Sequence, residues 1–208
     1  MKSTKPVKLN GKSHSKSGVT GTKRAIALHG QPETREYVLA LSEEGFLHRE
    51  LVRSRRAAEV AFFIRRPNGK YLLQTKSFYP EGSYRIPTGG IKKREDLTEA
   101  VYREAEEETS LKLSIKRFLG ILHYRFCWKD HQTDFATYVF LLEEEGGELM
   151  IQDGNERISG YREIEWQQLA KVAGTLLYDL PREWEGWGTF RAIVHQFVFE
   201  KLINENWS

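Results

Sequence analysis

The sequence of 208 residues is poor in cysteine and has no long apolar run. Cys127 is its only cysteine, which excludes an internal disulfide and indicates a reducing compartment such as the cytoplasm. No stretch approaches the roughly 18 consecutive apolar residues that a membrane-spanning helix needs, and the N-terminus has no apolar segment of the signal-peptide kind. We therefore expect no membrane partner. Hydrophobic residues make up 39% of the chain, which is enough to fill the core of one globular domain.

Acidic residues are absent from residues 1–24, which contain seven lysine and arginine residues. The rest of the chain is therefore net acidic, although the formal net charge of the whole chain is +3. This basic tail is also rich in serine, glycine and threonine, and because it has little to bury we predict that it is disordered. We favour a solubilising extension; the alternative is a weak, salt-sensitive arm for RNA or another polyanion.

Three glutamates interrupt the apolar face of a helix that the sequence predicts over 97–111. The apolar residues of that face recur at helical spacing: Leu97, Ala100, Val101, Ala105 and Leu111. At about 100° per residue, Glu104, Glu107 and Glu108 fall in the same arc. Buried carboxylates without partners cost several kcal/mol and repel one another. A divalent cation with oxygen ligands, most simply Mg²⁺, would make the cluster tolerable.

The residues from 89 to 111 resemble the signature of the Nudix hydrolases. Gly89, five residues, Glu95, seven residues and then the run from Arg103 to Leu111 match the family pattern at every defined position except Ser110, where the family usually has glycine. A serine in a left-handed position after a helix costs about 1–2 kcal/mol, but Ser110 carries no metal ligand. The resemblance implies that Glu95 and Arg103 form an ion pair that braces the loop against the helix.

The resemblance also implies a reaction. Glu104, Glu107 and Glu108 would be the catalytic and metal-binding carboxylates, with the Gly89 carbonyl as a further ligand and Mg²⁺, or Mn²⁺ as a substitute, as the metal. The implied substrate is a small nucleotide, a nucleoside diphosphate linked to another group, whose phosphoanhydride bond is hydrolysed by a metal-activated water. The alternative is a catalytically weak module that senses a nucleotide or binds RNA. The intact acidic positions favour the enzyme.

Residues outside the signature are candidates for the rest of the site. Glu156 is the candidate outlying acid, a position that can supply the general base in the family; Asp134 and residues 143–145 are alternatives. Lys76 and Arg85 precede the signature on expected strands and are candidate phosphate contacts. Three aromatic residues share one face of a later strand and either stack on a base or, as we favour, belong to the core: Tyr124, Phe126 and Trp128.

The expected elements predict an α+β fold. Expected strands cover 60–64, 71–75, 84–86, 118–128, 136–142 and 161–166. Besides the signature helix, expected helices cover 33–56 and 187–202. Strands on both sides of one central helix fit an α/β/α sandwich with mixed sheets, which is also the fold that the resemblance implies.

We divide the chain into four parts: the tail 1–24, an N-terminal helical extension 25–56, a Nudix-like domain 57–175 and a C-terminal helix in 176–208 that packs on the domain. The two extensions are also candidates for a homodimer contact. The substrate stays open at this point. The ADP-ribose-cleaving branch usually has a proline a short way past the signature, and this chain has none between Pro87 and Pro181.

Overall fold

The computed structural model describes residues 7–8, 18–54, 56–151 and 157–205. Its strands are β1 (Val7–Lys8), β2 (Glu33–Ala40), β3 (Ala58–Arg65), β4 (Tyr71–Lys76), β5 (Thr88–Gly90), β6 (Leu111–Trp128), β7 (His131–Gly147) and β8 (Ile158–Ile164). Its helices are α1 (Thr22–His29), α2 (Phe46–Ser54), α3 (Leu97–Thr109), α4 (Leu169–Tyr178) and α5 (Glu185–Asn204), with short 3₁₀ turns at Trp166–Gln168 and Arg182–Trp184. Among the helices in this part of the chain, none is long and apolar enough to cross a membrane.

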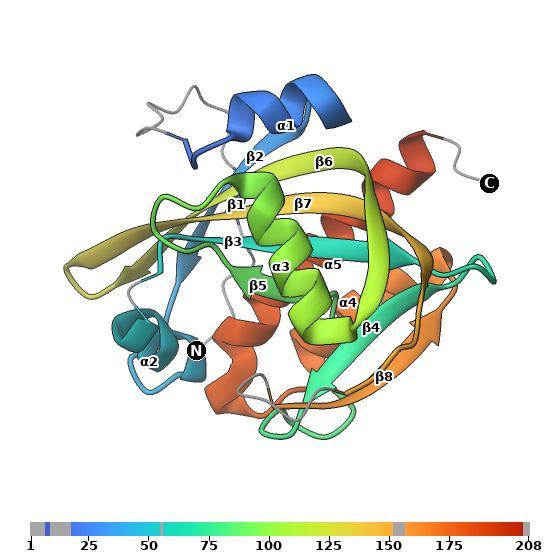
Figure 1. Ribbon diagram of the computed structural model, residues 1–208. Coiled ribbons are helices and arrows are strands. Elements are labelled where there is room, and N and C mark those ends of the chain that lie inside the picture. Colours follow the sequence, from blue (N-terminus) through green and yellow to red (C-terminus); the bar gives the residue numbers. More distant parts are fainter. Residues whose placement is uncertain (1–6, 9–17, 55, 152–156, 206–208) are drawn as a thin grey trace.

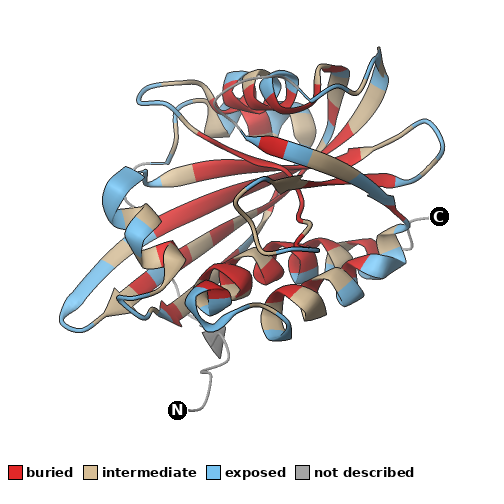
Figure 2. Cartoon of the chain, turned by 90° about the horizontal axis from the view of Figure 1, so that it is seen from below, coloured by how far each residue is buried: buried red, intermediate tan, exposed pale blue. Residues whose placement is uncertain are grey.

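The strands form one mixed sheet in the order β1-β2-β6-β7-β3-β4-β8, with β5 paired to β3 (Figure 1). Strand β3 is buried on both faces, as expected: Val60, Phe62 and Ile64 pack with α3, whereas Ala61 and Phe63 pack with α5. The alternation follows from the strand's period of two. Buried residues therefore gather between the sheet and the helices on either side (Figure 2). The expected α/β/α sandwich is the fold observed.

The segment 33–56 is not the single helix that the sequence predicts. Glu33–Ala40 forms β2, which runs parallel to β6, and only Phe46–Ser54 is helical. Tyr37 of β2 stacks on Tyr124 of β6 with ring centroids 5.7 Å apart. Aromatic and β-branched residues gain from such cross-strand packing, which overrides a partial helical period. Because β6 lies far later in the chain, local periodicity could not reveal this pairing.

The strand next to the glycine pair is also shifted from its expected place. Residues 84–86 make only one bridge, between Arg85 and Gln74. The strand proper is β5, Thr88–Gly90, which is antiparallel to β3. Pro87 separates the two because it has no N–H to donate to a neighbouring strand. The β3–β4 hairpin is confirmed, with Arg66 N–H donating to the Lys70 carbonyl at 2.8 Å.

Most of the basic tail lies outside the described residues. Helix α1 begins at Thr22, so the boundary expected at residue 24 falls inside a helix. Arg24 of α1 donates to Asp96 at 2.8 Å, and Asp96 in turn accepts the Thr98 N–H at 2.9 Å as the N-cap of α3. Helix α3 ends at Thr109, and its C-cap Ser110 adopts a left-handed conformation with φ of 62°.

We expect Ser110→Gly to stabilise the protein by about 1 kcal/mol, because glycine adopts this conformation without a Cβ clash but loses more entropy on folding. The melting temperature should rise by about 2–4 °C in thermal unfolding. Ser110→Ala is the control, since alanine keeps the Cβ and should give no gain. A melting temperature of Ser110→Gly at or below that of the wild type would contradict the prediction.

Candidate active site

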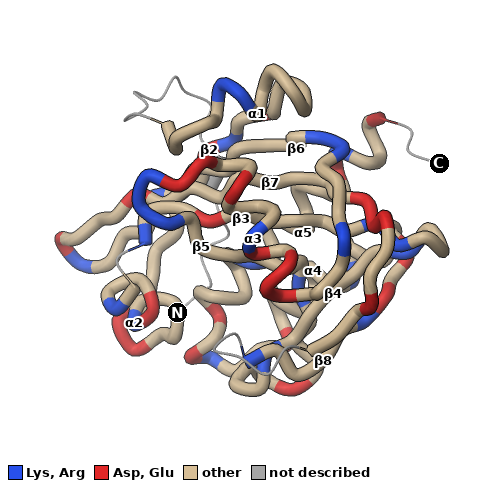
Figure 3. Tube along the Cα trace, in the orientation of Figure 1, with Lys and Arg blue, Asp and Glu red and all other residues tan. Residues whose placement is uncertain are grey.

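Two of the three signature glutamates turn into the molecule. Glu104 is 6% exposed and Glu108 is fully buried, whereas the Glu107 side chain is 47% exposed. The expectation that all three share the buried face is therefore wrong for Glu107. Figure 3 shows the acidic stretch along α3. Since Leu111 belongs to β6 rather than to the helix, the buried face ends at Thr109 and is centred near Glu108. Glu107 points about 100° away from that centre.

Arg103 ties the signature loop to the helix. Its guanidinium donates to both carboxylate oxygens of Glu95, at 2.6 and 2.9 Å, and to the Gly90 carbonyl at 2.9 Å. It also donates to Glu104 at 2.7 Å and to Glu107 at 3.0 Å. The hydrogen bond from Arg103 holds the pKa of Glu95 below its ordinary value. One side chain thus orients the loop and two of the acids together.

Strand β4 holds Glu108 from the opposite side. Gln74 Nε2 donates to Glu108 Oε2 at 2.8 Å, and Lys76 Nζ lies 3.2 Å from Oε1. The Tyr161 hydroxyl donates to the backbone carbonyl of Glu108. Burial, assisted by the Glu108 charge, raises the pKa of Tyr161 to about 12, so this hydroxyl remains a donor at neutral pH. Lys76, a candidate phosphate contact, is therefore close to the buried acid.

The glycine pair makes room on both faces of the sheet. A Cβ at Gly89 would lie 2.1 Å from both Cδ and Oε2 of Glu104. A Cβ at Gly90 would lie 2.8 Å from Cζ of Arg56. The two sites face opposite ways because successive residues of a strand alternate. Gly89 therefore admits the carboxylate of Glu104, and Gly90 admits a guanidinium on the other face.

The oxygen donors at this edge suit Mg²⁺ in their chemistry. Carboxylate oxygens of Glu104 and Glu108 and the Gly89 carbonyl are hard ligands of the kind that Mg²⁺ prefers. The close approach of Glu104 to Gly89 brings two of them together. Across the described residues, no three histidine, cysteine or acidic side chains are gathered closely enough to hold an ion. In this arrangement Arg103 and Lys76 supply the counter-charge to the two buried carboxylates.

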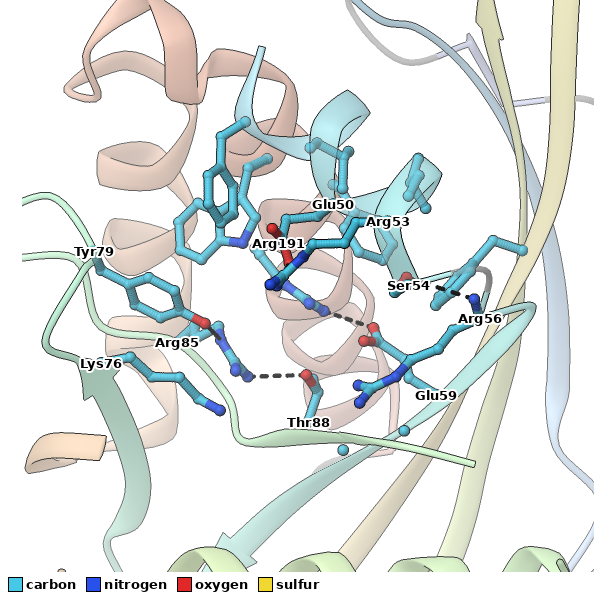
Figure 4. A pocket seen from close by; sticks show the side chains of 18 of the residues that line it. Glu50, Arg53, Ser54, Arg56, Glu59, Lys76, Tyr79, Arg85, Thr88 and Arg191 are labelled. Atoms are coloured by element: carbon cyan, nitrogen blue, oxygen red, sulfur yellow. Dashed lines mark hydrogen bonds and ion pairs between the residues drawn. The ribbon is translucent and has the colours of Figure 1, made fainter. Parts of the chain in front are cut away.

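A cavity of about 220 Å³ opens beside the glycine pair, between α2 and α5 (Figure 4). Its cationic lining residues are Arg53, Arg56, Lys76, Arg85 and Arg191. Its acidic lining residues are Glu50, Glu59 and Glu104, and its aromatic ones are Phe46, Phe78, Tyr79, Phe135, Trp187 and Phe190. The cavity thus offers cations for phosphate and flat apolar surfaces for a ring.

Arg85 is the buried cation of this cavity, at 2% exposure. Its Nε donates to the Tyr79 hydroxyl at 2.9 Å, and its Nη1 donates to the Ile86 carbonyl at 2.8 Å and to Thr88 Oγ1 at 3.0 Å. Burial works to lower the pKa of this guanidinium, but Tyr79 and Glu108 outweigh it, so the pKa lies above its ordinary value. The charge is retained although all three hydrogen-bond partners are neutral.

The aromatic residues of β6 do not line the cavity. Tyr124 and Phe126 are core residues, covered by Phe190 of α5, whose ring centroid lies 4.8 and 5.3 Å from theirs. Trp128 lies beside His48, with ring centroids 5.1 Å apart. The core interpretation therefore holds for Tyr124 and Phe126, which cannot be substrate contacts, whereas Trp128 is half-buried and does not line this cavity. The physical reason is the docking of α5 on this face of the sheet.

The candidate outlying acids that the structure describes lie away from the cavity. Glu156 lies outside the described residues. Asp134 accepts from Arg125 at 2.9 Å, and Glu143 lies 3.0 Å from Lys116. Neither acid lines the cavity.

Buried polar residues of β3 and α5 complete the cavity wall, and the sequence analysis missed them. Glu59 is 6% exposed and accepts from Thr137 Oγ1 at 3.0 Å and from Arg191 Nη1 at 2.6 Å. His195 Nε2 accepts the backbone N–H of Ile86 at 3.0 Å, so its Nδ1 carries the proton and donates to the Arg191 carbonyl at 2.8 Å. The sequence feature that could have indicated them is a polar residue next to or within an apolar segment. Glu59 directly precedes a buried strand, and His195 lies within an apolar helix.

Comparison with known proteins places this geometry in a family. The sequence pattern of the NUDIX domain matches residues 55–185. The chain belongs to the NUDIX family. The NUDIX match begins just before β3 and ends at the first residue of α5.

The NUDIX relatives found by comparison are distant. Over 97 residues the chain is 33% identical to a protein of Methanocaldococcus jannaschii named ADP-ribose pyrophosphatase, a match that covers 47% of this chain and 56% of that protein. The chain thus spans little more than half the length of this curated relative. Among solved structures, the MutT protein from Methanosarcina mazei Go1 is 20% identical, with 74% of this chain and 96% of that chain covered and a TM-score of 0.47. A NUDIX hydrolase from Nitrosomonas europaea is 19% identical, with 69% and 89% covered and a TM-score of 0.46.

We expect the stability of this NUDIX protein to fall in mild acid because of His195. Burial, with Arg85 and Arg191 nearby, lowers the pKa of His195 from 6.5 to about 4. The unfolded chain therefore binds a proton first as the pH falls, and stability present above pH 6.5 is lost between pH 6.5 and pH 4. The loss should be about 2 kcal/mol by pH 5, measured by urea unfolding.

His195→Gln is the matched control, because its amide oxygen can still accept the Ile86 N–H but does not titrate. Its unfolding free energy should depend less steeply on pH in this window than that of the wild type. Equal slopes for the two proteins would exclude His195 as the cause.

Proposed function

We propose that the chain is a Mg²⁺-dependent pyrophosphohydrolase that cleaves the phosphoanhydride bond of a nucleoside diphosphate linked to a second group. The observation that carries this proposal is the placement of two inward carboxylates: Glu104 lies against Gly89 and lines a cationic cavity, and the buried Glu108 lies 3.2 Å from Lys76, which lines the same cavity. A pyrophosphate at this edge would meet the acids and their metal on one side and Lys76 and Arg85 on the other.

The chain's own side chains would position the reacting groups. Bound Mg²⁺ would neutralise the pyrophosphate and lower the pKa of a bound water. Arg103 orients Glu104, and Gln74 with Lys76 orients Glu108. A carboxylate oxygen takes the proton as water adds to phosphorus, the bridging P–O bond breaks, and the second phosphoryl group leaves as a phosphate monoester.

ADP-ribose is the first compound to test, because the relative from Methanocaldococcus jannaschii carries the name ADP-ribose pyrophosphatase. The missing proline after the signature argues against that branch, so the panel should also contain nucleotide sugars, dinucleotides and NADH. Each compound presents a nucleoside diphosphate linked through its terminal phosphate to a different group. The panel thus separates the general reaction from the choice of substrate.

We expect Glu108→Gln to lower kcat on the best substrate of this panel by about a hundredfold or more, because the carboxylate that binds metal or accepts the proton is lost. Product monoesters measured by chromatography give the rate, with and without Mg²⁺. Glu106→Gln is the matched control, since Glu106 is exposed on the far side of α3. Its rate should equal that of the wild type.

Removal of Mg²⁺ by a chelator should abolish turnover in the wild type, and added Mg²⁺ should restore it. Turnover that survives chelation, or a Glu108→Gln variant as active as Glu106→Gln, would rule out the proposed mechanism. Thermal unfolding of each variant establishes that the compared proteins are folded.

A further inference from the structure

Arg56 reaches the cavity from the segment that follows α2, outside the signature. Its guanidinium lies over Gly90, where a Cβ would be 2.8 Å from both Cζ and Nη1 of Arg56. Glu59 is the cross-strand partner of Gly90 and lies on the same face of the sheet. The second glycine of the pair therefore provides the space that a side chain would otherwise deny to Arg56.

The nearby carboxylate does not neutralise Arg56. Glu59 Oε1 already accepts from Arg191 at 2.6 Å and from Thr137 at 3.0 Å. In the described ranges of the chain, no carboxylate forms an ion pair with Arg56. Arg85 also has no carboxylate as a hydrogen-bond partner, because its three hydrogen bonds go to neutral atoms.

These two unpaired guanidinium groups lie on opposite sides of Thr88 in the cavity (Figure 4). The other cations that line it have acidic partners: Arg53 with Glu50, Arg191 with Glu59 and Lys76 with Glu108. Arg85 is buried, where a cation without an anion is costly, and Arg56 is exposed, so an incoming anion can reach it; the pair therefore favours a ligand that brings negative charge.

We propose that Arg56 and Arg85 clamp the two phosphoryl groups of the substrate's pyrophosphate across Thr88. A P1,P2-diester of pyrophosphate has one ionised oxygen on each phosphoryl group, which matches the two unpaired guanidinium charges. The planar fork of arginine suits a phosphoryl group, and Gly90 holds one such fork at the edge where the bond would be cleaved. This inference rests on the proposed function and adds the two side chains that would bind the substrate's pyrophosphate.

Binding of inorganic pyrophosphate tests the clamp without any turnover. In isothermal titration calorimetry with EDTA present, Arg56→Gln should bind pyrophosphate about tenfold or more weakly than the wild type, because one charge-assisted hydrogen-bonding group is lost. Arg56→Lys should recover only part of the affinity, since it keeps the charge but not the fork. Arg49→Gln is the matched control, an equal charge change at an exposed residue of α2 outside the cavity, and should bind as the wild type does.

A double-mutant cycle tests whether the Arg56 side chain lies on Gly90. Gly90→Ala should displace Arg56 and weaken pyrophosphate binding, but it should add little to the loss in an Arg56→Gln background. Additive losses would overturn this placement of Arg56. Equal pyrophosphate affinity in Arg56→Gln and wild type would overturn the clamp, and so would a wild type that binds no pyrophosphate.

Failure of the clamp can be told apart from failure of the proposed function. If the protein is a hydrolase whose KM for its best diester pyrophosphate is unchanged by Arg56→Gln, the proposed function is supported and the clamp is contradicted. If the protein hydrolyses none of the panel but binds pyrophosphate through Arg56, the clamp is supported and the proposed function is contradicted.

Discussion

The contact between Glu104 and the loop at Gly89 sets the geometry of this site. A side chain at position 89 would occupy the space of the carboxylate, so the loop and α3 can approach each other only because a glycine stands there. Arg103 then joins the two through the Gly90 carbonyl and Glu95. The inward direction of Glu104 and the position of the cavity edge both follow from this contact.

Buried acids and a buried cation lie close together around β5. The acids Glu104 and Glu108 receive counter-charge from Arg103 and Lys76. Arg85, which lines the same cavity as Glu104, keeps its charge among neutral hydrogen-bond partners. A metal ion at the acids and an anionic substrate at Arg85 would each relieve a cost that the chain bears by itself. This complementarity is why we connect the acids and Arg85 in one reaction.

The elements outside the expected domain 57–175 contribute to the site. Helix α5 supplies Arg191 to the cavity and holds the chain before the glycine pair through His195. The end of α2 supplies Arg53, and Arg56 follows it just before that boundary. The NUDIX match also ends where α5 begins. We propose that the functional unit includes these segments, because the cavity has no wall on that side without them.

Local pattern in the sequence was sufficient for the signature residues, for α3 and for the buried strand β3, because helical and strand periods and short spacings depend on neighbours along the chain. It was also sufficient to raise the core interpretation of Tyr124 and Phe126. The tertiary structure alone decided that Glu107 faces solvent, that residues 33–40 form a strand and that Arg56 lies on Gly90. Each of these outcomes depends on where a helix ends or on a contact with a residue far away in the sequence. Neither the helix end nor the distant contact produces a periodic pattern in the sequence.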